Sequence, residues 1–114
     1  MKMTRKPKGK VMILVCSGKL MGGPDYEKFH GEIKSVIAEG FKNVLLDFEK
    51  ITFINSTGVG ILISGYTTLT TNEGQLKICK LTDRVESIFI VSQLDRVFEL
   101  FWDCEQALAS FGAS

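Results

Sequence analysis

The stretch Ile51-Thr-Phe-Ile-Asn-Ser-Thr-Gly-Val-Gly-Ile-Leu62 joins an expected strand, residues 43–48, to an expected helix, residues 59–71. Three short polar side chains stand between the two elements: Asn55, Ser56 and Thr57. Such residues are favoured helix N-caps because their oxygens accept hydrogen bonds from the first free backbone N–H groups. The same N–H groups and the positive end of the helix dipole also stabilise a phosphate. A hydroxyl at this place is therefore a cap, a phosphate acceptor or both.

Outward from this stretch, strands alternate with helices. Continuous apolar runs predict strands at residues 11–16 and 43–48, each covered on both faces, and residues 75–79 predict another strand. Residues 1–6 are expected to form an exposed edge strand that turns at residues 7–9, because lysines and a proline are typical of such an edge. Residues 49–50 are expected to turn into an extended segment, 51–54, and residues 94–100 to form a loop and a short last strand. Helices are expected from Pro24 to Gly40, from Val59 to about Thr71, from Thr82 through Phe89, and from Cys104 to Phe111.

This order of elements predicts an α/β fold. Strands that alternate with helices pair in parallel through right-handed crossovers, and the first strand would lie antiparallel at the edge. We expect a small mixed β-sheet of four to five strands flanked by four to five α-helices. With 114 residues, the chain is expected to form a single domain over residues 1–114.

Charge is distributed unevenly along the chain. The formal net charge is +1, but the first ten residues hold five of the fourteen basic residues and no acid. No basic helix follows this arm, so its charges are only weak evidence for nucleic-acid binding. A solvated edge segment explains the basic residues better. No stretch approaches the roughly 20 apolar residues that cross a bilayer, and no signal peptide is evident. We expect a cytoplasmic protein that contacts neither nucleic acid nor membrane directly.

The three cysteines, Cys16, Cys79 and Cys104, are widely spaced and form no CxxC pair. This spacing provides neither a thioredoxin-like motif nor a zinc ribbon. Buried, reduced thiols are the expectation for such cysteines in a cytosolic protein.

The residues that carry catalysis are scarce. The single histidine, His30, lies beside Phe29 in an expected helix, where a structural role is favoured over catalysis. Neither a GxSxG elbow, a Walker A sequence, a GxGxxG fingerprint nor an HExxH helix occurs. The carboxylates of Asp47, Glu49 and Asp83 do not form a convincing metal set. The sequence therefore predicts a non-enzymatic protein with no catalytic residue, no metal ligand and no cofactor.

One segment resembles a known family signature. Asn43-Val-Leu-Leu-Asp-Phe-Glu-Lys-Ile-Thr-Phe-Ile-Asn-Ser-Thr-Gly-Val-Gly60 is similar to the central motif of STAS domains, named for sulfate transporters and anti-sigma factor antagonists. The family pattern is a strand, a short linker and Asp-Ser-(Ser/Thr)-Gly-Leu-Gly. Gly74-Gln-Leu-Lys-Ile78 and Gln93-Leu-Asp-Arg-Val-Phe98 also resemble later family segments, so the likeness spans nearly the whole chain.

The resemblance implies an anti-sigma factor antagonist that works by partner switching. Unphosphorylated, such a protein binds an anti-sigma factor serine kinase and so frees a sigma factor for transcription. The kinase phosphorylates the serine of the motif, here Ser56, and ends the contact, which a PP2C-type serine phosphatase restores. The resemblance places the partner-binding surface at the motif: Asn55, Ser56, Thr57, Gly58, Val59 and Gly60. Exposed parts of the helix at residues 82–89 would extend it.

Two positions depart from the family pattern. The usual Asp before the serine is Asn55, and the family's Gly-Glu-Leu-Asp appears as Gly18-Lys19-Leu20-Met21, so the site is less negative. Two alternatives therefore stay open. One is a constitutive STAS scaffold or transporter-associated subunit in which Ser56 is only a cap. The other is a module that holds a nucleotide or an anion at the same helix end.

Overall fold

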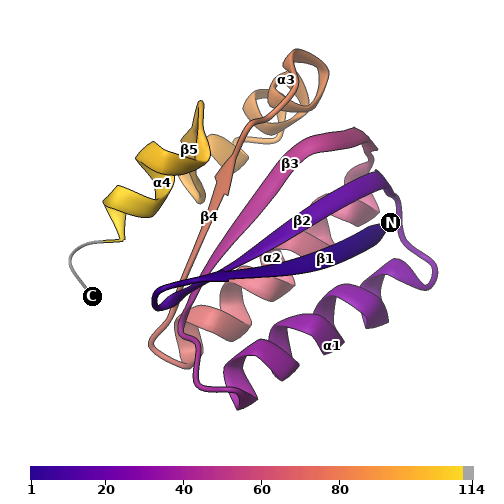
Figure 1. Cartoon of the computed structure of the whole chain (residues 1–114). Helices are drawn as coiled ribbons and strands as arrows, with labels where there is room; N and C mark the ends of the chain where they lie inside the picture. The colour runs from indigo at the N-terminus through magenta and orange to yellow at the C-terminus, as the bar shows by residue number, and fades with distance from the viewer. Residues whose placement is uncertain (112–114) are drawn as a thin grey trace.

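The computed structural model describes residues 1–111, in which strands and helices alternate (Figure 1). In chain order the elements are β1 (Lys2–Lys8), β2 (Val11–Leu20), α1 (Asp25–Ala38), β3 (Asn43–Ile54), α2 (Ser56–Thr71), β4 (Gln75–Cys79), α3 (Asp83–Val91), a 3-10 helix η1 (Leu94–Arg96), β5 (Glu99–Phe101) and α4 (Cys104–Ser110). The predicted α/β class is confirmed.

The five strands form one mixed sheet in the order β1-β2-β3-β4-β5. Strand β1 is antiparallel to β2, and the other neighbours are parallel. This is the arrangement that the order of elements predicts, because each parallel pair is joined by a helical crossover. The carboxyl ends of β2 and β3 consequently lie together at one end of the sheet, where Leu20 pairs with Ile54.

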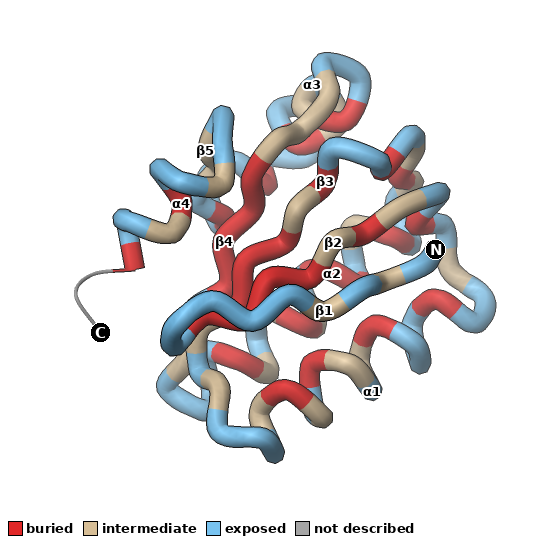
Figure 2. The backbone as a smooth tube through the Cα atoms, viewed as in Figure 1, coloured by how far each residue is buried: buried red, intermediate tan, exposed pale blue. Residues whose placement is uncertain are grey.

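The sheet is covered on both faces, but unequally. One face packs against α1, α2 and α3 in the larger apolar cluster, which includes Phe29, Phe48 and Phe89. The other face carries a smaller cluster beneath α4, with Leu45, Ala107 and Phe111 among its members. Figure 2 shows the buried segments of β2, β3 and β4 at the centre and the exposed edge strand β1. The runs of apolar residues in β2 and β3 are explained by this two-sided burial.

The basic N-terminal arm is the edge strand β1, as expected, but the turn expected at residues 7–9 lies at Gly9 and Lys10, because Pro7 and Lys8 pair with β2. Its alternate residues face opposite sides of the sheet. Arg5 faces α1, where its guanidinium donates to Glu32, Glu39 and the Ser35 hydroxyl. This pairing lowers the pKa of the Glu39 carboxyl and raises that of the Arg5 guanidinium. Arg5 thus ties the edge strand to the helix beneath it.

Strands β2 and β3 are longer than the sequence pattern predicts. Residues 49–50 do not form a turn, because β3 runs without interruption from Asn43 to Ile54. Strand β2 continues past Ser17 and Gly18 to Leu20, with register shifts near both residues. Each strand supplies backbone partners for the other, and these partners keep both extended. The extension carries the end of the sheet as far as the start of α2.

Two further boundaries differ from expectation. Helix α2 begins at Ser56, three residues before the expected Val59, because it is capped by Asn55. The segment expected to begin as a loop forms the 3-10 helix η1, whereas the short last strand expected after it is present as β5. The expected starts of α3, capped by Thr82, and of α4 at Cys104 are confirmed.

The expectation of three reduced thiols is wrong for two of them. Cys79 and Cys104 form a disulfide, with their Cα atoms 5.5 Å apart. They are 25 positions apart in sequence, and only the packing of α4 on the sheet brings them together. Cys16 is a free, buried cysteine, and burial, together with the nearby charge of Asp47, raises the pKa of its thiol to about 12. Cys16 is therefore held protonated at neutral pH.

Candidate functional site

The start of α2 is fixed by the side chain of Asn55. Its Oδ1 accepts a hydrogen bond of 2.8 Å from the backbone N–H of Gly58. Its Nδ2 donates a 3.0 Å hydrogen bond to the carbonyl of Met21, in the loop that follows β2. The backbone of Asn55 is extended, as an N-cap requires, at φ −111° and ψ −176°. Asn55 therefore caps the helix and joins it to the β2–α1 loop.

We expect Asn55→Ala to lower the free energy of unfolding by about 1 to 2 kcal/mol, because it removes the cap and the bond to the loop. Asn55→Asp keeps an acceptor for Gly58 and places a negative charge at the positive end of the helix. This variant should therefore lower the free energy of unfolding less than Asn55→Ala does. Urea denaturation measures both. An Ala variant as stable as the wild type would show that the cap contributes nothing.

Ser56 is the first residue of α2 and is exposed. Within residues 1–111, its hydroxyl has no hydrogen-bond partner, because Asn55 already provides the capping oxygen. Helix geometry leaves the first backbone N–H groups without acceptors inside the helix. Among the described residues, the Ser56 hydroxyl therefore has no partner, and it lies at the positive end of α2.

Gly58 lets the end of β2 approach the helix closely. A Cβ at Gly58 would lie 2.1 Å from the carbonyl oxygen of Leu20 and 2.8 Å from the side chain of Ile54. Gly22 in the loop after β2, at φ +113°, lies against Thr57, whose Cγ2 would be 2.8 Å from an added Cβ. The motif glycine and the loop glycine therefore hold the end of β2 and the start of α2 in contact.

An exposed surface surrounds Ser56. Thr57 and Gly60 are exposed, and a Cβ at Gly60 would meet nothing within 4 Å. Ile63 is 39% exposed, and it follows Ser56 by seven positions, which places it on the same helix face. Met21, whose carbonyl accepts from Asn55, is 44% exposed. We call Met21, Ser56, Thr57, Gly60 and Ile63 the α2 surface.

The α2 surface has little negative charge of its own. The first turn of α2 contains no acidic residue. Lys19, near the end of β2, is exposed and pairs with Phe53, three positions before Ser56. An added phosphate on Ser56 would therefore meet the helix dipole without a neighbouring carboxylate from this turn.

The six predicted site residues do not have equal exposure. Ser56, Thr57 and Gly60 are exposed, Asn55 and Val59 are half-buried, and Gly58 is buried. Val59 also packs against the larger apolar cluster. Sequence reasoning missed Met21 and Ile63. The spacing of Ile63 from Ser56 was a usable signal, whereas Met21 reaches the site only through the turn after β2.

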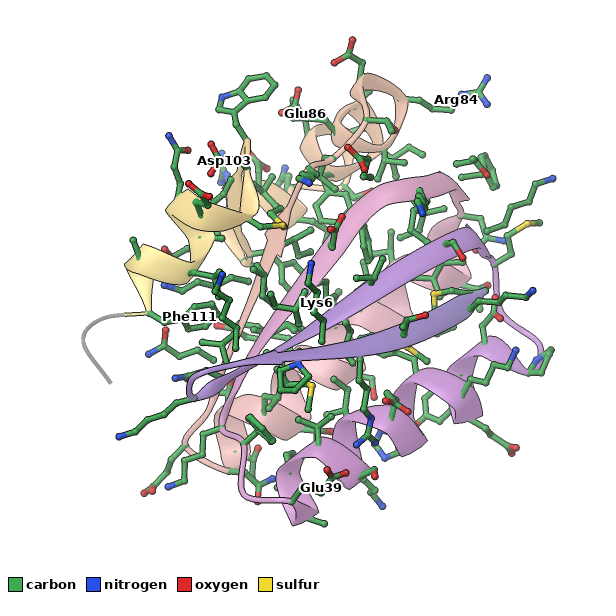
Figure 3. All side chains as sticks on the ribbon, in the orientation of Figure 1. Lys6, Glu39, Arg84, Glu86, Asp103 and Phe111 are labelled. Carbon is green, nitrogen blue, oxygen red and sulfur yellow. A yellow bond between two sulfur atoms is a disulfide. The ribbon has the colours of Figure 1, made fainter. Side chains whose placement is uncertain are left out.

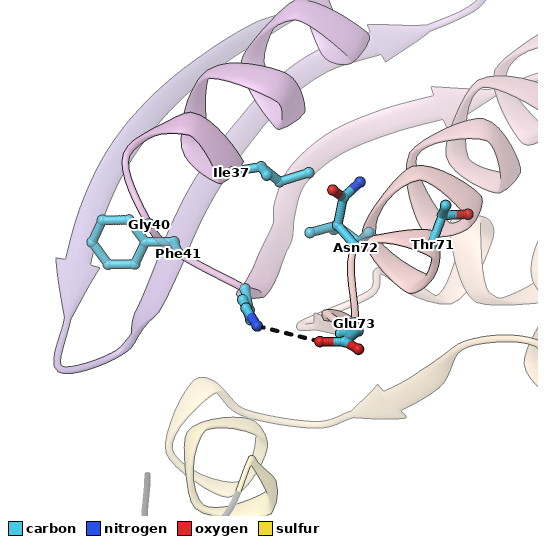
Figure 4. Close-up of a pocket in the computed structure, with 8 residues that line it drawn as sticks. Ile37, Gly40, Phe41, Thr71, Asn72 and Glu73 are labelled. Atoms are coloured by element: carbon cyan, nitrogen blue, oxygen red, sulfur yellow. Dashed lines mark ion pairs between the residues drawn. The ribbon is translucent and has the colours of Figure 1, made fainter.

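The expected exposed part of the third helix lies on α3, at Asp83, Arg84 and Ser87. A surface pocket lies elsewhere, at the carboxyl ends of α1 and α2 (Figure 4). Its lining includes Ile37, Phe41 and Asn72, and the exposed Lys42 and Glu73 form an ion pair of 3.6 Å at its rim. This pocket is at the opposite end of α2 from Ser56. Among residues 1–111, none of the helices has the length and apolar content that crossing a membrane requires.

The fold and the capped helix start define a small α/β domain with a mixed five-stranded sheet. The STAS domain family model matches residues 2–107. The chain therefore belongs to the STAS family.

Known proteins of this family show how far the likeness extends. The chain is 24% identical over 100 residues to the putative anti-sigma factor antagonist BtrV of Bordetella bronchiseptica. The aligned region covers 88% of this chain and 86% of that protein. The structure of the phosphorylated form of SpoIIAA, a Bacillus cell fate determinant, is similar with a TM-score of 0.72 and 18% identity, over 97% of this chain and all of that one. A sulfate transporter family protein from Wolinella succinogenes is similar with a TM-score of 0.77 and 20% identity, over 89% and 84% of the chains. The structural likenesses establish the fold.

Proposed function

We propose that this protein is an anti-sigma factor antagonist whose binding to an anti-sigma factor serine kinase is switched by phosphorylation of Ser56. The observation that carries the proposal is that the helix cap and the exposed hydroxyl at the start of α2 belong to different residues. Asn55 caps the helix, and the Ser56 hydroxyl next to it is exposed and has no partner within the described residues. A modification of Ser56 therefore breaks no hydrogen bond within the described residues.

The position of Ser56 suits a reversible charge switch. A phosphate adds about 1.5 to 2 negative charges and three acceptor oxygens. At the first residue of α2 these charges lie at the positive helix end, so the free protein tolerates them. In a complex, the same charges would lie on the α2 surface, which includes the exposed Met21 and Ile63, and burial there without a counter-charge is unfavourable. Phosphorylation then ends the contact and leaves the fold intact.

The relatives support this proposal. The matched protein of Bordetella bronchiseptica is described as a putative anti-sigma factor antagonist, and the matched Bacillus protein has a phosphorylated form. By this likeness the partner is an anti-sigma factor serine kinase, and a PP2C-type phosphatase restores the free hydroxyl. Regulation of sigma-factor-dependent transcription in the cytoplasm follows from the same proposal.

The main alternative is a constitutive scaffold or transporter-associated subunit, which the likeness to a sulfate transporter family protein favours. The neutral Asn55 in place of the usual Asp fits this alternative equally well. In that case the α2 surface would bind its partner permanently, and Ser56 would not be modified.

Incubation with the candidate kinase and ATP separates the two functions. We expect mass spectrometry to find one phosphate on the peptide that contains Ser56, and fragment ions to place it on Ser56 rather than on the exposed hydroxyl of Thr57. Ser56→Ala should receive none. Transfer of phosphate to Ser56→Ala, or none to the wild type from a kinase that binds it, would contradict the proposal.

A further inference from the structure

A second chemical site lies on the sheet face beneath α4, away from α1 and α2. Cys79 is the last residue of β4, and Cys104 is the first residue of α4. Asp47 of β3 is the direct sheet partner of Cys79. One sulfur or carboxylate oxygen from each of these three residues lies within 4.8 Å of the others. Asp103 and Phe111, labelled in Figure 3, mark the two ends of the helix that the disulfide holds.

We propose that Cys79 and Cys104 form a reversible thiol–disulfide site that exchanges with small disulfides of the glutathione class and so fastens or releases α4. Nothing in this proposal depends on Ser56 or on a protein partner.

The two sulfurs have different access to solvent, which sets the order of reaction. Cys79 is fully buried, whereas Cys104 is half-buried. During oxidation, the Cys104 thiol loses its proton and its sulfur attacks glutathione disulfide, forming a mixed disulfide and releasing one glutathione thiolate. The Cys79 thiol then loses its proton, and its sulfur attacks the sulfur of Cys104 and releases the second glutathione thiolate. The two released thiolates take up two protons, so one protein disulfide and two glutathione thiols replace two protein thiols and one glutathione disulfide.

Asp47 is placed to favour the reduced pair. Its Oδ2 lies 3.7 Å from the Cys104 sulfur, where a reduced thiol would donate to it. Its Oδ1 accepts a 3.1 Å hydrogen bond from the backbone N–H of Glu49, which fixes the carboxylate. A carboxylate beside a thiol disfavours the thiolate that must attack during oxidation. Asp47→Asn should therefore speed oxidation and shift the pair toward the disulfide.

Release of the disulfide would loosen α4. The helix has seven residues, and a helix this short is unstable without tertiary contacts. Besides the disulfide, Ala107 and Phe111 pack on the sheet, and the Lys77 ammonium donates to the carbonyl and hydroxyl of Ser110, at 2.9 and 2.8 Å. Beneath α4 lie apolar residues of β2 and β3: Val11, Ile13 and Leu45. Opening the disulfide thus exposes more of this apolar strip.

A glutathione titration of the full chain tests the chemistry. After equilibration at different ratios of glutathione to its disulfide, rapid alkylation and mass spectrometry count the free thiols. We expect two thiols to appear together at reducing ratios and to disappear at oxidising ones, with Cys16→Ala unchanged in this respect. Cys79→Ala should trap one glutathione on Cys104, whereas Cys104→Ser should trap none on Cys79. Cys79 and Cys104 thiols that persist at every ratio, or a disulfide that excess glutathione does not open, would overturn the proposal.

Hydrogen exchange tests the structural consequence. Amides of residues 104–110 should exchange faster in the reduced protein by about tenfold or more, and Cys104→Ser should show the same increase without any reductant. Residues 56–71 of α2 serve as the internal control and should not change. Equal exchange of α4 in both redox states would show that the disulfide does not fasten the helix, and this outcome also overturns the proposal.

Discussion

Ser56→Asp is expected to weaken binding to the proposed partner, an anti-sigma factor kinase, by about 100-fold or more while the fold stays intact. The two effects separate because the same charge meets different surroundings. In the free protein, a carboxylate at the first helical residue lies at the positive end of α2 and changes stability by no more than about 1 kcal/mol, in the favourable direction. In the proposed complex, it would be desolvated on the α2 surface, and an unpaired buried charge costs several kcal/mol.

Thr67→Asp is the matched control for this variant. Thr67 is exposed on the same helix, eleven positions after Ser56, so the substitution adds an equal charge about three turns away. Thr67→Asp should bind nearly as well as the wild type, and Ser56→Ala should bind as tightly as the wild type and resist phosphorylation. Calorimetry gives the affinities, and thermal unfolding gives the stabilities. Equal affinities for Ser56→Asp and the wild type would contradict a charge switch at this position.

The second large effect is expected at the motif glycines, where the same substitution should act in opposite directions. Gly58→Ala would place a Cβ 2.1 Å from the Leu20 carbonyl oxygen, so the backbone of β2 or α2 must move. We expect a loss of about 3 kcal/mol or more in the free energy of unfolding, or failure to fold. Gly60→Ala meets nothing within 4 Å and removes a flexible residue from a helix interior, so a gain of about 0.5 to 1 kcal/mol is expected.

Urea denaturation of the two variants provides the comparison, and each is the control for the other. Because both changes replace a glycine of the same helix with the same residue, helix propensity alone predicts the same sign for both. Changes of opposite sign in the free energy of unfolding would show that the loss in Gly58→Ala comes from the contact with Leu20. If Gly58→Ala were as stable as Gly60→Ala, the close approach of the end of β2 to α2 would not hold in solution.

The sequence predicted the alternation of strands and helices because strands that are buried on both faces of the sheet appear as continuous apolar runs. The apolar runs of β2 and β3 lie in the centre of the sheet, and the basic residues of β1 lie on its edge. The pattern failed at residues 49–50, where Glu49 and Lys50 read as a turn. Their exposed side chains resemble those of a turn, but pairing of Lys50 with Ser17 keeps the backbone extended.

The candidate site could be predicted in part. The polar residues before α2 identified the helix start, but the choice between Asn55 and Ser56 as the cap required the hydrogen bond to Gly58. The glycines looked alike in sequence, yet a side chain on Gly65 would collide with Phe29, whereas Gly60 is open. The disulfide between Cys79 and Cys104 depends on contacts across the sheet that residue spacing does not encode.

The most direct test of the account compares two forms of the wild-type chain, unphosphorylated and phosphorylated on Ser56, for binding to the same anti-sigma factor kinase by calorimetry. The account predicts that the unphosphorylated form binds at least about 100 times more tightly, with both forms equally folded by circular dichroism. Equal affinity of the two forms would contradict it and would favour a constitutive scaffold.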